Sequence, residues 1–281
     1  MSPIPVPPNL QTVVSNALAE DIGSGDLTAG LVPAASRATA TVTAREACVV
    51  CGTPYFNEAM RQVDQETRVT WHVSEGALVA AQTKLCTITG MARALLTTER
   101  VAINFLQTLS ATATVTRRHV DAVAGTRAKV VDTRKTIPGL RLAQKYAVRV
   151  GGGANHRIGL FDGILIKENH IMAAGGIAPA LAAARAQARG GTMIQIEVET
   201  LAQLEAAIAA GANLILLDNF TPERMAEAVR LTAGRAELEA SGGINLDTIR
   251  TYAQTGVDRI SVGTLTKDIK AIDLSMRFQA G

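Results

Sequence analysis

Residues beyond 110 alternate between short apolar runs and stretches with helical spacing of apolar positions. Six runs have the length of buried strands: AKVVD (128–132), GILI (163–166), MIQIEV (193–198), LILL (214–217), ELEA (237–240) and RISV (259–262). Helical patterns lie between them, near residues 143–150, 178–189, 201–210, 222–233 and 246–255. Strands that alternate with helices predict βαβ units and a parallel sheet. We expect a closed or nearly closed α/β barrel rather than an open dinucleotide-binding sheet, because no GxGxxG motif follows the first strand.

The first 110 residues have a different pattern. Apolar spacing predicts helices over residues 10–18 and 92–109, and short β-branched segments between turns predict strands. The strand segments are ATATVTA (38–44), ACVVCG (47–52), TRVTWHV (67–73) and KLCTITG (84–90), which indicate a small antiparallel or mixed sheet. A last helix-like stretch, 267–278, is expected to return to this region. We therefore expect one domain over 1–110, joined by 267–281, and a barrel domain over 111–266.

Composition narrows the function classes. Apolar residues make up 47% of the 281 residues and charged residues 19%, which is enough for a core and excludes intrinsic disorder. Aromatic residues are 3%, too few for a protein that stacks nucleic-acid bases, and the net charge of +3 is weak for a binder of polyanions. No run of uncharged apolar residues is long enough to predict a membrane span. We expect no nucleic-acid partner and no membrane partner.

The N-terminal sequence and the cysteines bear on the compartment. MSPIPVPPNL has neither the basic end nor the apolar centre of a signal peptide. Three cysteines, an odd and low number, fit a reducing compartment, so we expect a cytoplasmic protein. Cys48 and Cys51 form a lone CxxC without a second pair of zinc ligands, and we interpret them as buried thiols rather than as a metal or redox pair.

Polar residues follow or end every apolar run of the barrel region. In chain order these residues are Asp132-Thr133-Arg134-Lys135, Lys167, Glu197, Asp218, Ser241-Gly242-Gly243 and Gly263-Thr264. The carboxyl ends of the strands in an α/β barrel form one rim, where active sites lie. One polar strand end is uninformative, because strands must stop somewhere. Six in succession predict an active site at this rim.

The basic residues are concentrated between Arg134 and Lys167. This segment contains seven of them and a single acid, Asp162. Guanidinium groups match carboxylates bidentately and lysine supplies a point charge, so the rim predicts a strongly anionic substrate. His156 beside Arg157 adds a further donor. In the alternative interpretation, some of the basic residues only solvate a helix face.

Acidic and glycine residues at the later strand ends indicate a phosphorylated substrate. Glu197 and Asp218 end consecutive strands and together can hold a hydrated magnesium ion on such a substrate, whereas their alternative role is to form salt bridges with the lysines. Ser241-Gly242-Gly243 and Gly263 let backbone amides approach a phosphate closely, as commonly happens after the seventh and eighth strands of such barrels. Elsewhere the SGG sequence would be only a turn.

These segments closely resemble one family, the quinolinate phosphoribosyltransferases, also called nicotinate-nucleotide pyrophosphorylases (carboxylating). The resemblance rests on DTRKTIPGLRLAQKYAVRVGGGANHR (132–157), LIKENHI (165–171), IEVE (196–199), LLDN (216–219) and SGGI (241–244). EDIGSGDLTA (20–29) and TTERVAINFLQTLSATAT (97–114) look like the same family. The family resemblance implies an α/β fold with an N-terminal α/β sandwich domain and an incomplete parallel α/β barrel. It also implies transfer of the phosphoribosyl group of 5-phosphoribosyl-1-pyrophosphate to quinolinate with decarboxylation, which yields nicotinate mononucleotide, pyrophosphate and CO2 in de novo NAD biosynthesis.

The resemblance also implies roles for individual residues. Quinolinate carboxylates would be held by Arg134, His156, Arg157 and Lys167. The ribose, the pyrophosphate and Mg²⁺ would be surrounded by Lys135, Glu197 and Asp218, the three expected catalytic residues, with Glu197 and Asp218 as metal ligands. Thr133 would also bind substrate, and the 5-phosphate would lie against Ser241, Gly242, Gly243, Val262, Gly263 and Thr264. Arg100 would enter the active site of a neighbouring subunit in a homodimer with shared sites, whereas from its pattern alone it is equally a snorkelling arginine at the border of a helical stripe.

Two alternatives remain open at this stage. One is a relative of the same fold that acts on another carboxylate, which the complete set of four carboxylate-binding cations disfavours. The other is a non-catalytic anion-binding barrel. Glu197 and Asp218 argue against it, because simple capture of an anion would not use acidic residues.

Overall fold

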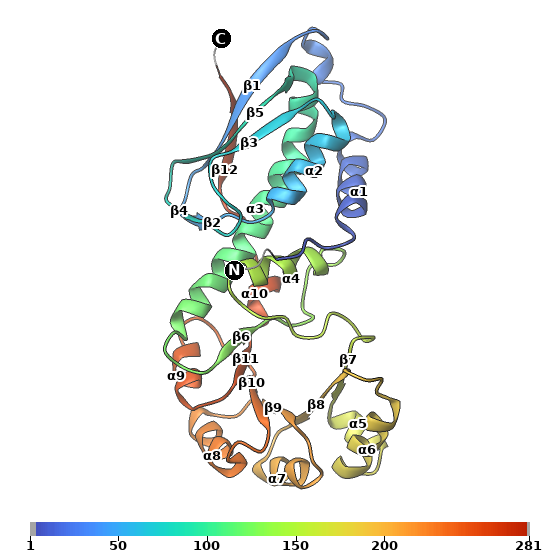
Figure 1. Ribbon diagram of the computed structural model, residues 1–281, viewed down its shortest axis with the longest axis vertical. Coiled ribbons are helices and arrows are strands. Elements are labelled where there is room, and N and C mark those ends of the chain that lie inside the picture. The colour runs from blue at the N-terminus through green and yellow to red at the C-terminus, as the bar shows by residue number, and fades with distance from the viewer. Residues whose placement is uncertain (1–3, 280–281) are drawn as a thin grey trace. The chain divides into compact units, whose positions relative to one another are not determined.

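The computed structural model describes residues 4–279, which fold into two compact units (Figure 1). One unit contains the chain up to Arg117, the segment Thr136–Gly152 and the chain from Asp268 onward. The other contains Arg118–Lys135 and Gly153–Lys267. The division differs from the expected domains mainly at Thr136–Gly152, which lies in the first unit.

The first unit is built on an antiparallel sheet with strand order β12-β1-β5-β3. The strands are β1 (Arg37–Ala44), β3 (Arg68–Trp71), β5 (Thr83–Met91) and β12 (Leu274–Phe278), and two short strands, β2 (Cys48–Val49) and β4 (Leu78–Val79), pair separately. Three of the four predicted N-terminal strand segments form this sheet. The fourth, ACVVCG, supplies only β2. The small antiparallel sheet expected here is confirmed.

Helices supply the rest of the first core. They are α1 (Leu10–Ile22), the short 3₁₀ helix η1 (Ala29–Leu31), α2 (Thr53–Val63), the beginning of α3 (Ala92–Ala122) and α4 (Arg141–Val150). The buried core combines side chains from four helices and from the sheet, such as Val14, Phe56, Ile88, Leu106 and Tyr146. Because Tyr146 and its neighbours on α4 belong to this core, residues 136–152 fold with the first unit.

Two parts of the first unit differ from the sequence prediction. The stretch 267–278 was predicted to be helical, and this is wrong beyond the short helix α10 (Thr264–Lys267). Leu274–Phe278 is the strand β12, which pairs with β1 in antiparallel register, as Val42 opposite Met276 illustrates. The helix α2 was missed, although Pro54 in its first turn is a typical helix-start signal.

The second unit contains a six-stranded parallel sheet with order β6-β11-β10-β9-β8-β7. Its strands are β6 (Lys129–Val131), β7 (Gly163–Ile166), β8 (Met193–Val198), β9 (Leu214–Asp218), β10 (Glu237–Ser241) and β11 (Arg259–Ser261). The connecting helices are α5 (Glu168–Ala173), α6 (Ile177–Gln187), α7 (Leu201–Ala209), α8 (Pro222–Thr232) and α9 (Ile249–Gln254). All six predicted strands are present.

The parallel sheet is an open barrel. β6 and β7 are its two edge strands, and among the described residues they do not pair with each other. Helices α6 to α9 cover the outer face of the sheet (Figure 1). The incomplete barrel that the family resemblance implied is therefore confirmed. None of the described helices combines the length and the apolar content that crossing a membrane requires.

Candidate active site

A cavity of about 690 Å³ lies at the carboxyl ends of the parallel strands. Every residue that lines it belongs to the second unit. Thirteen of the fifteen substrate-binding residues expected from the sequence line it: Thr133, Arg134, Lys135, His156, Arg157, Lys167, Glu197, Asp218, Ser241, Gly242, Gly243, Gly263 and Thr264. The rim predicted from the polar strand ends thus lines one cavity.

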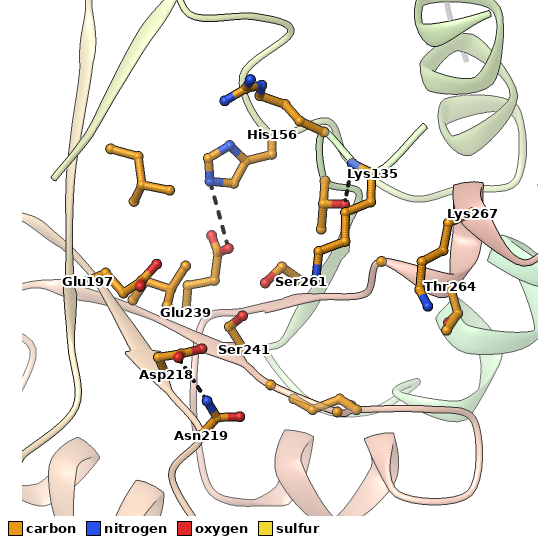
Figure 2. Close-up of a pocket in the computed structure, with 18 of the residues that line it drawn as sticks. Lys135, His156, Glu197, Asp218, Asn219, Glu239, Ser241, Ser261, Thr264 and Lys267 are labelled. Atoms are coloured by element: carbon orange, nitrogen blue, oxygen red, sulfur yellow. Dashed lines mark hydrogen bonds and ion pairs between the residues drawn. The ribbon is translucent and has the colours of Figure 1, made fainter. Parts of the chain in front are cut away.

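The cavity has both acidic and basic side chains, and several of them lie on different sides of it. Figure 2 shows Glu197 and Asp218 on one side and Lys135, Thr264 and Lys267 on the other. The acids come from the ends of β8 and β9, whereas the basic side lies after β6 and in α10. A cavity with both signs of charge suits a phosphorylated substrate that arrives with a cation, rather than a simple anion.

Arg134 and Arg157 form a second basic region of the same cavity. The pKa of the Arg157 guanidinium lies below its usual range, first because burial disfavours its charge and second because the Arg134 charge is close. The charge of Asp162 raises the pKa of Arg157 and so offsets part of this effect. The guanidinium of Arg157 also donates to the Gly163 carbonyl through Nη1 at 3.0 Å, which fixes its direction. Two cations held near each other favour a bound anion, because the anion relieves their repulsion.

Lys167 and Glu197 form an ion pair across neighbouring strands. Lys167 Nζ lies 3.3 Å from Glu197 Oε2, and the Lys167 side chain remains 52% exposed while that of Glu197 is 15% exposed. Of the two roles considered for Glu197, the salt bridge to a lysine is therefore present. Both side chains nevertheless line the cavity, so the pair is accessible to a ligand.

Asp218 and Asn219 at the end of β9 are tied to the glycine turn after β10. Asn219 Nδ2 donates to Asp218 Oδ2 at 2.8 Å, and Asn219 N donates to the Ser241 carbonyl at 3.0 Å. Asn219 and Gly242 both have positive φ, 56° and 109°. A Cβ atom at Gly242 would lie 3.0 Å from Asn219 Cα and closer still to Asn219 Oδ1. Gly242 is therefore required by its conformation and by space.

The turn after β6 places Lys135 against Gly263. The Thr133 hydroxyl accepts from Lys135 N at 3.0 Å, and Thr266 Oγ1 donates to the Lys135 carbonyl at 2.8 Å. A Cβ atom at Gly263 would lie 3.1 Å from Lys135 Cδ. Glycine at position 263 thus leaves room for the Lys135 stem to run along the backbone at the end of β11.

His156 is held by hydrogen bonds within the protein. Asp132, fully buried, accepts from His156 N at 2.8 Å and from Asn155 Nδ2 at 2.6 Å. His156 Nδ1 accepts the Arg157 N–H at 2.8 Å, and His156 Nε2 lies 2.7 Å from Gln195 Oε1. Both ring nitrogens therefore have a partner within the protein. A direct bond from the His156 ring to a substrate carboxylate, expected from the resemblance, is not favoured here.

The other two expected residues lie elsewhere. Val262 is 1% exposed, and its N–H donates to the Val131 carbonyl at 2.9 Å, so neither its side chain nor its amide faces the cavity. Arg100 is an exposed residue of α3 in the first unit and does not line the cavity of the second unit.

Some lining residues were not expected. They are Leu165, Leu216, Asn219, Glu239, Ile244, Asn245, Ser261 and Lys267. Alternation along the strands could have found four of them, because each stands two residues before an expected site residue and so faces the same side of the sheet: Leu165, Leu216, Glu239 and Ser261. No signal in the sequence identifies Lys267, which reaches the cavity from the short helix α10.

Two family models match the chain. "Quinolinate phosphoribosyl transferase, C-terminal domain" matches residues 112–277, and the N-terminal domain model of the same name matches residues 26–110. The chain belongs to the quinolinate phosphoribosyltransferase family. The resemblance seen in its motifs is thereby confirmed.

Members of the quinolinate phosphoribosyltransferase family match over their full length. The probable nicotinate-nucleotide pyrophosphorylase (carboxylating) of Bacillus subtilis is 40% identical over 267 residues, which cover 95% of this chain and 92% of that protein. The corresponding protein of Mycobacterium leprae is 43% identical over 273 residues, with coverage of 94% and 95%. The structure of the nicotinate-nucleotide pyrophosphorylase from Francisella tularensis superposes with a TM-score of 0.95 at 47% identity and covers 98% of both chains.

Proposed function

We propose that the cavity of the second unit is where this chain carries out its reaction. The chain is a decarboxylating quinolinate phosphoribosyltransferase, a pentosyltransferase of NAD biosynthesis, as its family and its full-length relatives at about 40% identity support. Quinolinate and 5-phosphoribosyl-1-pyrophosphate are its substrates. The observation that ties this activity to one place is the gathering of thirteen expected residues around a single cavity.

Arg134, Arg157 and Lys167 are the residues we assign to the two carboxylates of quinolinate. The lowered pKa of Arg157, caused by burial and by the Arg134 charge, indicates a site that gains from a bound anion. Guanidinium groups bind carboxylates bidentately, which would also orient the ring nitrogen toward the second substrate. A dicarboxylate can use all three cations, whereas a monocarboxylate leaves at least one of them without a contact to the substrate.

We assign phosphoribosyl pyrophosphate to the opposite side of the cavity. The amides around Ser241, Gly242 and Gly243, together with Gly263 and Thr264, suit the 5-phosphate, because two glycines there allow close backbone approach. We assign Lys135 and Lys267 to the pyrophosphate, because both line this side of the cavity and carry positive charge. We leave Val262 out of this set because its amide is already bonded to Val131.

Glu197 and Asp218 fit the role of magnesium ligands that act together with the substrate. The described residues include no group of three or more His, Cys, Asp or Glu side chains that could hold a metal ion by themselves. Mg²⁺ is commonly held by one or two carboxylates together with substrate phosphates and water, which is the donor set this cavity offers. When bound, the ion would neutralise charge on the departing pyrophosphate.

The chemistry needs positioning and charge stabilisation rather than a protein nucleophile. Pyrophosphate leaves the anomeric carbon of ribose through an oxocarbenium-like state, while the quinolinate nitrogen forms the new bond. The arginines hold one anion and the glycine turns hold the other, so that the two reacting atoms meet. Lys135 stabilises the charge of the leaving group. Decarboxylation follows because the new pyridinium stabilises the carbanion left at the ring.

We also propose a homodimer in which Arg100 completes the partner's cavity. Arg100 is exposed on α3, so it is available to a neighbouring molecule. The family resemblance of the segment 97–114 supports this role.

Incubation of the purified protein with quinolinate, phosphoribosyl pyrophosphate and magnesium tests the function directly. Stoichiometric nicotinate mononucleotide, pyrophosphate and CO2 are expected. Binding of both substrates without product would instead support the non-catalytic anion-binding barrel, and turnover of a different carboxylate alone would support a relative with another substrate.

A further inference from the structure

Glu239 is a fully buried carboxylate in the floor of the cavity. It is 0% exposed and stands on β10 directly opposite Arg259 of β11. Its Oε2 lies 3.1 Å from Arg259 Nε and accepts from Gln195 Nε2 at 3.1 Å. Among the residues that the structure describes, its Oε1 has no hydrogen-bond partner, and it lies 3.8 Å from His156 Nε2, as the dashed line in Figure 2 marks. Burying a carboxylate is costly unless its oxygens are paired, and here Arg259 pairs only with Oε2.

The direction of each hydrogen bond in this cluster follows from the carboxylate. An ionised carboxylate only accepts hydrogen bonds, so Gln195 must turn its NH2 group toward Glu239 and its carbonyl oxygen toward His156. His156 Nε2 must then carry the proton that Gln195 Oε1 accepts. In a neutral ring the other nitrogen, Nδ1, keeps its lone pair, and this lone pair accepts the Arg157 N–H at 2.8 Å.

We propose that Glu239 and Gln195 are positioning residues that fix the tautomer of His156, and that His156 in turn holds the backbone of Arg157 beside the anion site. In this view His156 serves the substrate through Arg157 rather than by a bond of its own. Both ring nitrogens are engaged in fixed directions, and the network reaches from the buried floor to a cation that lines the cavity. The kinetic part of this inference rests on the proposed function, whereas the tautomer does not.

The substitution Glu239→Gln replaces a carboxylate, which only accepts hydrogen bonds, with an amide of the same size that also donates them. If the new amide oxygen keeps its contacts with Gln195 Nε2 and Arg259, its NH2 group faces the His156 Nε2–H while Gln195 Oε1 still accepts from that group. If the NH2 group faces Gln195 instead, Gln195 turns over and presents its own NH2 group to His156. Both orientations place a donor beside His156 Nε2, and the second also removes the Gln195 acceptor, which favours movement of the ring proton to Nδ1, where it opposes the Arg157 N–H.

The tautomer is measured by NMR on protein with ¹⁵N-labelled histidine rings. The chain has four histidines, and the His156 signal is identified by its absence in His156→Asn. We expect the wild-type ring to be neutral with the proton on Nε2, and Glu239→Gln to add a population with the proton on Nδ1. A wild-type ring protonated on Nδ1 would overturn the proposal without any need for a variant.

Kinetics provide the second measurement. Glu239→Gln and Gln195→Leu should each raise KM for quinolinate on the order of tenfold and leave KM for phosphoribosyl pyrophosphate near its wild-type value. Because the two residues act in series, the double variant should be no worse than the poorer single one.

Glu237→Gln, the same change at an exposed position of β10, is the matched control and should behave as wild type. Additive effects, or equal losses for both substrates, would show a merely structural role. If the wild-type protein shows no turnover at all, the proposed function is wrong, whereas the NMR measurement still tests the tautomer.

Discussion

Gly242 and Asn219 are in contact at the end of adjacent parallel strands, and the space between them has no room for a side chain on residue 242. A Cβ atom there would lie 3.0 Å from Asn219 Cα, and the φ of 109° at Gly242 is unfavourable for other residues. Asn219 in turn is bonded to Asp218 and to the Ser241 carbonyl. This one contact therefore joins the expected phosphate turn to an expected metal ligand.

Gly242→Ala should disturb the phosphate turn and Asp218 together. We expect KM for phosphoribosyl pyrophosphate to rise at least tenfold and the protein to lose roughly 1–3 kcal/mol of stability from backbone strain. Gly234→Ala is the control, because Gly234 also has positive φ but open space around it. Steady-state kinetics and denaturant unfolding measure both effects. Equal KM values for the two variants would contradict the contact as the cause.

The cation set predicts discrimination between two pyridine acids. Nicotinate has one carboxylate and quinolinate two, so nicotinate leaves part of the Arg134, Arg157 and Lys167 cluster without an anion. We expect nicotinate to bind more weakly by about 1.5–3 kcal/mol, the usual contribution of hydrogen bonds to a charged group. Isothermal titration calorimetry with each acid checks this. Equal affinities would mean that the cluster does not recognise the second carboxylate.

The two acidic residues should matter for turnover more than for quinolinate affinity. Glu197→Gln and Asp218→Asn are expected to lower kcat by about 10²-fold or more, because Mg²⁺ and the pyrophosphate lose a ligand. Quinolinate affinity should stay within about threefold of the wild-type value, because the exposed ion pair between Lys167 and Glu197 contributes little free energy. Glu199→Gln, an exposed position just beyond β8, is the control. Rates equal to wild type at limiting magnesium would leave the two carboxylates with only a structural role.

The buried thiols predict a loss of stability at high pH. Burial raises the pKa of Cys48 to about 11 and that of Cys86 to about 12, from 9.0 for an ordinary thiol. Above about pH 9 the unfolded chain releases these protons and the folded chain does not, so unfolding becomes easier as pH rises toward the folded values. Each thiol should contribute on the order of 1–3 kcal/mol.

Denaturant unfolding at pH 7.5, 9 and 10.5 measures this effect. The free energy of unfolding should fall between pH 9 and 10.5 in the wild type and fall less steeply in the double variant Cys48→Ala/Cys86→Ala. If the free energy of unfolding fell equally with pH in the wild type and in the double variant, the two thiols would not be the cause of the loss of stability. The interpretation of the CxxC as buried thiols agrees with the structure, in which Cys48, Cys51 and Cys86 are all buried and free.

The proposed dimer is tested by mixing two inactive variants, Arg100→Ala and Lys167→Ala. If Arg100 serves the partner's cavity, a mixed dimer has one site with both lesions and one site with neither. Random subunit exchange should then restore activity to roughly a quarter of wild type at equal mixing. The absence of recovery, with exchange demonstrated by mass spectrometry, would assign Arg100 to its own chain.

The sequence alone predicted much of the second unit. Its strands are short runs rich in apolar residues, wholly apolar in LILL (214–217) and interrupted by Gln195 or Glu239 in others, and this local composition is enough to locate them. The order of strands and helices then places every strand end at one rim, and thirteen site residues could be named before any coordinates. The motifs from Asp132 to Arg157 likewise identified the family from the sequence alone.

Other features depended on residues that are distant in the chain. β12 is a strand because its backbone pairs with β1, more than 200 residues earlier, and its own pattern did not predict this. The bonds that join His156 to Gln195 and Glu239 connect three separate segments, so no local spacing encodes them. The family resemblance implied that Val262 binds the phosphate, but its amide donates to the Val131 carbonyl. Local patterns determine which segments become strands and helices, whereas hydrogen-bond partners and buried charges are decided only when distant segments meet.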